Sequence, residues 1–279
     1  MINGFIARNW KLRLVGHPSE ESYNLDNNGI LAVADGVTRD PAPYLQKGLL
    51  GKLQFALKYP NPSPAKIVAD LFCETFPKVL RDYNLSNRDE KAVRGAFIEA
   101  NDEINYWNKQ NILNVDYVMN DYAGCVASGI VEQNGVIYWG FLTDCGVAIF
   151  DEEGGLRFRT ENEGPHKVGK YIWQDQLIKD KTWNQPEVRA RIRSYYRNNP
   201  NEEYSFGVLT GQPEAINYVR TGVQEIRSND YLVIYSDGLE QIIFSDSFSC
   251  KLRERDTKGL ERLCKKNVET EGTLVLKNN

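Results

Sequence analysis

Short apolar runs that stop at a turn signal recur along this chain of 279 residues, and they limit the folds it can adopt. Residues 123–131 and 136–142 are two such runs, and Asn134-Gly135 lies between them. Asn-Gly tolerates the positive φ angles of a tight hairpin, so this stretch predicts two antiparallel strands. Similar runs predict further strands at residues 29–34, 146–150, 231–235 and 273–276.

Helical patterns fill the gaps between these strands. Residues 89–107 carry apolar side chains at spacings of three and four, which predicts one buried stripe. Asp40-Pro41 indicates the start of a second helix with a leucine every four residues. A third helix is expected over residues 62–76 and should break at Pro77. Hairpins with inserted helices favour antiparallel sheets covered by helices, an α+β arrangement, over alternating βαβ units.

Composition narrows the class of protein. Hydrophobic residues make up 41% of the chain and charged residues 26%, as in an ordinary globular protein. The absence of a long linker predicts a single domain over residues 1–279, and we expect a monomer.

A net charge of −4 argues against nucleic-acid binding, and no apolar run is long enough to span a membrane. Five scattered cysteines and two histidines predict neither a disulfide framework nor a zinc site, so we expect a cytoplasmic protein.

Two of the apolar runs end in Asp-Gly, at Asp35-Gly36 and Asp237-Gly238, and Asp144 follows a third. Asp-Gly is also a very common turn dipeptide, so each instance alone can be a simple turn. Three strand-end carboxylates in a chain with two histidines nevertheless favour a site for Mg²⁺ or Mn²⁺, which prefer oxygen ligands.

The order of these segments resembles that of the 2C-type, metal-dependent serine/threonine protein phosphatases, the PPM family. Residues 32–37 look like the first metal motif of that family, and residues 226–239 look like its later Ser-Asp-Gly segment. Residues 123–127 and 141–146 lie where the family has a Gly-Ser/Thr-Thr-Ala strand and a Gly-Asp-Ser-Arg motif. The resemblance implies a four-layer α/β/β/α sandwich of two antiparallel sheets flanked by helices.

The resemblance also implies a centre of two Mn²⁺ or Mg²⁺ ions, with a third, weaker ion. Asp35 would bridge two ions, and the Gly36 carbonyl would be a further ligand. Asp237 would bind the first ion, and Asp144 would help Asp237 hold the third. Adjacent cations acidify a bridging water, and the resulting hydroxide can attack phosphorus in line. Asp35 and Glu21 would be catalytic, because Glu21 stands where the family has an acid that orients this water.

The chain departs from the family at the phosphate-binding position. The usual arginine, five residues before the water-orienting acid, is replaced by Gly16. Arg13 and His17 are nearby candidates for binding substrate. Arg39 is a third, because Thr38-Arg39 replaces a glycine pair in the first metal motif.

A second departure concerns the metal ligands. Glu21 is one methylene longer than the family's Asp, and Thr270 occupies the register of a ligating Asp. Glu269 and Glu271 are the nearest acids, and Glu271 is the candidate metal ligand.

By the same resemblance, residues 156–206 lie where the family has a variable flap near the metals, and this segment is called the flap below. A helix is expected over residues 186–197, with Arg189, Arg191, Arg193 and Arg197 exposed. This cluster either binds an acidic or phosphorylated partner segment or forms a solvated basic face.

The sequence therefore predicts metal-dependent hydrolysis of phosphoserine and phosphothreonine, with a phosphorylated protein as partner. The departures motivate an alternative: a weak or inactive pseudophosphatase that acts as a binding or regulatory module. A third possibility is an unrelated α/β protein whose Asp-Gly turns are coincidental. Cys125 and Cys145 are expected to be small core residues, because this chemistry needs no cysteine nucleophile.

Overall fold

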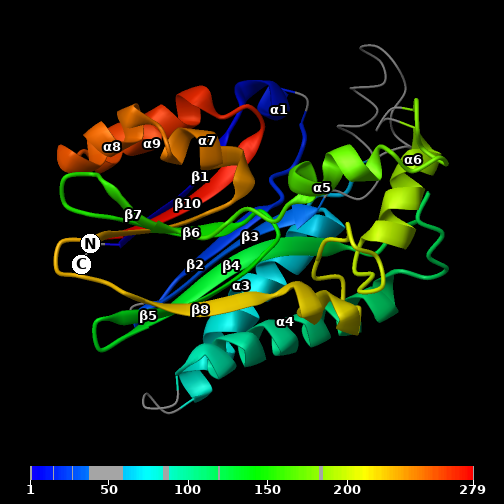
Figure 1. The fold of residues 1–279 in the computed structure, drawn as a ribbon, viewed down its shortest axis with the longest axis horizontal. Helices are drawn as coiled ribbons and strands as arrows, with labels where there is room; N and C mark the ends of the chain where they lie inside the picture. The colour runs from blue at the N-terminus through cyan, green and yellow to red at the C-terminus, as the bar shows by residue number, and fades with distance from the viewer. Residues whose placement is uncertain are drawn as a thin grey trace.

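Two antiparallel sheets lie face to face, and helices cover the outer face of each (Figure 1). The predicted α+β, four-layer sandwich is confirmed. The computed structural model of the protein describes residues 2–14, 16–26, 28–37, 59–83, 88–118, 120–181 and 185–278.

One sheet joins the two ends of the chain. Its strand order is β1-β10-β9-β6-β7, and every neighbouring pair is antiparallel. Helices α8 (Asp246–Arg253) and α9 (Thr257–Asn267) pack on its outer face, where Phe248 and Leu260 belong to the same buried cluster as Tyr235. Its strands are β1 (Ile2–Arg8), β6 (Gly146–Phe150), β7 (Leu156–Arg159), β9 (Tyr231–Tyr235) and β10 (Glu271–Asn278).

The other sheet contains the predicted hairpin. Its order is β2-β3-β4-β5-β8, again antiparallel throughout. Asn134 and Gly135 have φ angles of 52° and 77° in the turn between β4 and β5, so the hairpin prediction is confirmed. Its strands are β2 (Glu21–Leu25), β3 (Ile30–Val37), β4 (Gly124–Gln133), β5 (Val136–Leu142) and β8 (Arg220–Glu225).

Strand β3 is apolar on both faces because both faces are covered. Leu31 and Val33 point into the core between the two sheets, together with Ile234 of β9. Ala32 and Ala34 point the other way, toward α3 (Pro64–Asp82). The alternation along a strand thus explains why residues 29–34 form an unbroken apolar run.

Helix α3 continues through Pro77, so the predicted break there is wrong. The helix begins after Ser63, whose hydroxyl accepts a hydrogen bond from the backbone N–H of Lys66. Proline removes one backbone hydrogen bond from a helix. Phe76 and Leu80, on either side of Pro77, are fully buried against the sheet, and this packing keeps the helix continuous.

Helix α4 follows its predicted pattern. Asp89 caps its N-terminus by accepting a hydrogen bond from the N–H of Ala92, and Val93, Phe97 and Ile104 are fully buried.

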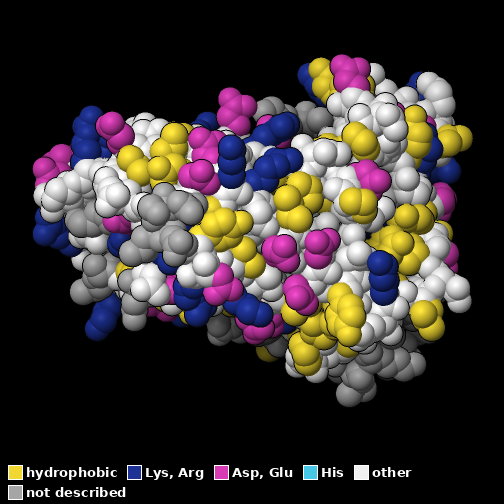
Figure 2. Space-filling model, turned by 90° about the horizontal axis from the view of Figure 1, so that it is seen from below, with side chains coloured by type: hydrophobic (Ala, Val, Ile, Leu, Met, Phe, Trp, Pro, Cys, Tyr) yellow, Lys and Arg dark blue, Asp and Glu magenta, His cyan; other side chains and the backbone are white. Residues whose placement is uncertain are grey.

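On the outer side of α3 and α4, viewed in Figure 2, acidic side chains lie among hydrophobic ones. The helix expected from Asp40 lies outside the described residues.

The remaining helices are short, and several gather at one end of the sandwich beside the strand ends (Figure 1). No helix within the described ranges combines the length and apolar character needed to cross a membrane. A π-helical turn (Ile192–Tyr196) extends α6, and 3₁₀ turns cover Pro213–Tyr218 and Asp237–Leu239. The described helices are α1 (Trp10–Leu14), α3 (Pro64–Asp82), α4 (Glu90–Asn111), α5 (Pro165–Ile172), α6 (Pro186–Arg191), α7 (Glu240–Ile243), α8 (Asp246–Arg253) and α9 (Thr257–Asn267).

Candidate metal centre and active site

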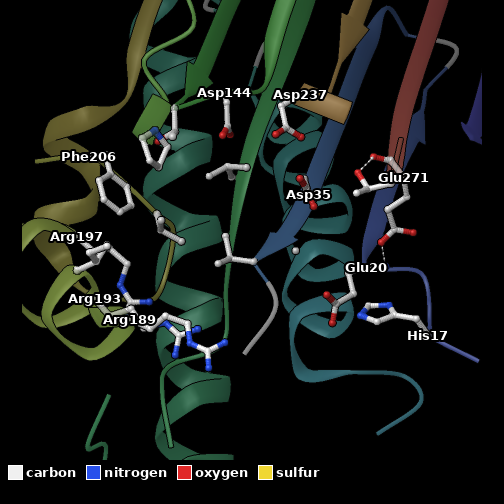
Figure 3. Close-up of a pocket in the computed structure, with 18 of the residues that line it drawn as sticks. His17, Glu20, Asp35, Asp144, Arg189, Arg193, Arg197, Phe206, Asp237 and Glu271 are labelled. Carbon is white, nitrogen blue, oxygen red and sulfur yellow. Dashed lines mark hydrogen bonds between the residues drawn. The ribbon is translucent and has the colours of Figure 1, made fainter. Parts of the chain in front are cut away.

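The three strand-end aspartates lie in one cavity of about 540 Å³. Asp35 comes from the end of β3, Asp144 from the turn between β5 and β6, and Asp237 from the residues just after β9 (Figure 3). The fold therefore brings together carboxylates from both sheets. A chance occurrence of the Asp-Gly turns would leave Asp35 and Asp237 far apart, whereas here they line the same cavity.

Glu21 is fixed directly beside Asp35. The two residues are cross-strand partners on β2 and β3, and Glu21 is fully buried. Its Oε1 accepts a 2.8 Å hydrogen bond from the Ser236 hydroxyl, which in turn accepts a 2.9 Å bond from the N–H of Thr273. Ser236 therefore ties the water-orienting candidate to the opposite sheet.

Gly36 occupies a position that excludes a side chain. A Cβ there would lie 2.6 Å from the carbonyl oxygen of Ala65 and 2.8 Å from that of Glu20. The Gly36 N–H also donates a 3.1 Å hydrogen bond to the Glu20 carbonyl. The glycine thus allows β3, α3 and the segment before β2 to meet next to Asp35.

Burial and mutual repulsion raise the pKa values of Asp35 and Asp144, which line the cavity, and of Glu21, which is buried beside Asp35 and is not part of the lining. Burial raises the pKa of Glu21 to about 8, and the charges of Glu271 and Asp237 contribute. Burial also raises the pKa of Asp144 to about 7, with a contribution from Asp237. The pKa of Asp35 is raised well above its usual range by burial and then by the charges of its acidic neighbours. A cation placed among these groups would favour their ionised forms.

The donor set fits a hard divalent cation that keeps water ligands. Glu21 Oε2 and Asp144 Oδ1 are buried and accept no hydrogen bond within the described part of the chain. Among the described residues, no group of three or more His, Cys, Asp or Glu side chains lies close enough together to hold a metal ion without other ligands. Mg²⁺ is commonly held by one or two carboxylates and several waters, so this spacing is compatible with it.

Glu271 lines the cavity, and its two carboxylate oxygens have different partners: Oε1 accepts a hydrogen bond, whereas Oε2 has an ion pair and no hydrogen bond within the described residues. Oε1 accepts a 2.9 Å hydrogen bond from the N–H of Glu20, and Oε2 lies 3.1 Å from Arg8 Nε. Its role as a metal ligand therefore remains a prediction. Glu269, the alternative acid, is exposed in the turn before β10.

Among the predicted substrate-binding residues, His17 lines the cavity. Its ring stacks on Tyr59 at a centroid distance of 5.4 Å, and its Nδ1 lies 2.7 Å from the Pro18 carbonyl. The side chain of Arg13 and the whole of Arg39 lie outside what the structure describes, so both remain predictions.

The expected exposure of the flap arginines is wrong: two are buried, and the other two, Arg191 and Arg193, are only partly exposed. Arg189 is 7% exposed and Arg197 is 4% exposed. Both line the same cavity as the aspartates, as does Arg193 (Figure 3). The reason is tertiary: Arg197 donates two hydrogen bonds, of 2.9 and 2.6 Å, to the buried carboxylate of Asp121. No local sequence pattern joins residues 76 positions apart, so the sequence carried no signal for this placement.

Cys125 and Cys145 are core residues, as predicted. Both are buried, and burial raises the pKa of each thiol well above its usual range. They are therefore protonated thiols rather than nucleophilic thiolates.

The sequence matches no family model and no curated protein. Solved structures, by contrast, match over nearly the whole chain. One is the catalytic domain of the serine/threonine protein phosphatase PstP, solved in complex with two manganese ions, which is 15% identical to this chain. The match covers 99% of this chain and 96% of that one, with a TM-score of 0.59. The S. agalactiae serine/threonine phosphatase is 14% identical to this chain. The match covers 99% of this chain and 98% of that one, with a TM-score of 0.59. PppA, a regulatory component of the type VI secretion system (T6SS) in Pseudomonas aeruginosa, is 14% identical, with 100% and 98% covered and a TM-score of 0.55.

The protein therefore has the fold of the 2C-type serine/threonine phosphatases. The fold implied by the sequence resemblance is confirmed.

Proposed function

We propose that this protein hydrolyses phosphoserine and phosphothreonine in proteins with the help of Mn²⁺ or Mg²⁺. The observation that carries the proposal is the meeting of Asp35, Asp144 and Asp237 in one cavity. It is supported by the shared fold with serine/threonine phosphatases, one of which was solved with two manganese ions.

The chain's own residues would divide the work. Asp35, the Gly36 carbonyl and Asp237 would hold two ions, and Asp144 would help Asp237 hold a third. When bound, such ions neutralise phosphoryl oxygens and acidify water. Glu21 would orient the attacking water through Oε2, since the Ser236 hydroxyl already occupies Oε1.

A phosphorylated protein segment is the proposed substrate, and a cytoplasmic location is part of the same proposal. All five cysteines are free thiols, which is typical of a reducing compartment.

The proposal is tested with a phosphothreonine peptide and the full chain. Removing divalent ions with EDTA should abolish phosphate release, and adding Mn²⁺ should restore it. Asp35→Asn should lower the restored rate at least about a hundredfold, because it removes a charge at the reacting centre. Asp246→Asn, at an exposed aspartate on α8, is the matched control and should leave the rate unchanged.

Peptide binding without phosphate release at millimolar Mn²⁺ would contradict the proposal. That result would instead favour the pseudophosphatase alternative.

A further inference from the structure

The cavity that holds the aspartates has a second, oppositely charged wall. Arg189, Arg193 and Arg197 come from α6, the π-helical turn and the residue that follows it. In Figure 3 they lie together on the side of the cavity away from Asp144 and Asp237. Carboxylates and guanidinium groups thus face one space from two sides.

A buried carboxylate anchors this wall. Asp121 is 3% exposed and accepts two hydrogen bonds from Arg197. Its Oδ2 also lies 3.2 Å from Arg193 Nε, so one carboxylate serves two guanidinium groups. Arg193 and Arg197 are held by this contact, which limits the side-chain freedom that ligand binding would otherwise have to remove.

Packing also fixes the backbone that carries the wall. Val188, Ile192 and Tyr196 are buried together with Val126 of β4, beside the cavity. Arg191 lies outside the cavity lining: it pairs with Asp175 at 2.8 Å and stacks on Tyr195. Of the arginines on this segment, the structure thus singles out Arg189, Arg193 and Arg197 for the cavity.

We propose that Arg189 and Arg193 bind the phosphoryl oxygens of a phosphomonoester in this cavity, with Asp121 and Arg197 as positioning residues. Guanidinium groups recognise phosphate through paired, charge-assisted hydrogen bonds. The inference relies on the proposed function for the identity of its ligand.

The test measures phosphate binding separately from turnover. Isothermal titration of inorganic phosphate into the full chain, with and without Mn²⁺, should show Arg189→Gln and Arg193→Gln each raising Kd at least about tenfold. The same variants should raise KM for an aryl phosphate more than they lower kcat. Arg253→Gln, on α8 at the far end of the molecule, is the matched control and should change neither value.

Thermal melting identifies variants that lose the fold. For any glutamine variant that does, Arg189→Lys and Arg193→Lys take its place, and they should raise Kd less because they keep the positive charge. Folded variants with unchanged Kd and KM would overturn the inference and show that these arginines only hold the flap. A chain that binds phosphate through them but releases none from substrate would contradict the proposed function and leave this inference standing.

Discussion

Gly36 is a residue at which the architecture of the centre tolerates little change. A methyl group there would approach two backbone carbonyl oxygens, at 2.6 and 2.8 Å, and neither can move without shifting β2 or α3. We therefore expect Gly36→Ala to destabilise the protein by about 1–3 kcal/mol, as overpacking does elsewhere. Urea unfolding measures this change.

Gly169 provides the matched control. A Cβ at Gly169, within α5, has no heavy atom within 4 Å. Gly169→Ala should stabilise the protein slightly, because alanine favours a helix by about 0.5–1 kcal/mol over glycine. Equal unfolding midpoints for the two variants would contradict the steric account of Gly36.

The buried acids predict a pH dependence of the metal-free protein. Glu21 has a pKa raised to about 8 in the folded state, whereas the unfolded chain has the ordinary value of 4.5. The folded state therefore binds more protons across this window, and its stability falls as pH rises from about 4.5 to about 8. Asp144 acts in the same direction up to about pH 7.

Urea unfolding in EDTA at pH 5.5 and pH 8.5 measures this dependence. Glu21→Gln should flatten the profile, because glutamine does not titrate. A stability that rises between these two pH values would show that the acids are not buried together as described.

At the scale of elements, one buried carboxylate anchors the flap. Asp121 holds Arg197 and Arg193 from outside the flap. Asp121→Asn removes its charge, and breaking a buried pair in this way costs about 3–5 kcal/mol. We expect faster hydrogen exchange across residues 186–198, measured by mass spectrometry.

The surface pair between Lys181 and Glu187 is the control. These groups are 3.9 Å apart and both exposed, so Glu187→Gln should change the stability by less than about 1 kcal/mol. Flap exchange that is as slow in Asp121→Asn as in the unchanged chain would refute the anchoring role.

Local signals predicted some elements well and others poorly. The hairpin at Asn134-Gly135 and the stripe of α4 follow from rules that act over a few residues. The continuation of α3 through Pro77 depends on burial of Phe76 and Leu80, which the local sequence does not contain. The burial of Arg197 likewise depends on Asp121, far away in the chain.

At the scale of the whole molecule, the order of the strand-end motifs in the sequence indicated which carboxylates would meet in the fold. Asp35, Asp144 and Asp237 were singled out because each follows an apolar run, and the sandwich places the ends of those strands at one cavity. The engagement of Glu271 by Arg8 and Glu20 was not predictable, because it depends on the register of β10 against β1. Sequence order thus indicated the centre, whereas the partners of single side chains required the structure.

The most direct measurement of the central claim is Mn²⁺-dependent release of phosphate from an aryl phosphate by the intact chain and by Asp237→Asn. The account predicts release that rises with Mn²⁺ and falls at least about a hundredfold in the variant, because Asp237 shares its cavity with Asp35 and Asp144. No release at millimolar Mn²⁺, or an equal rate in the variant, would contradict it.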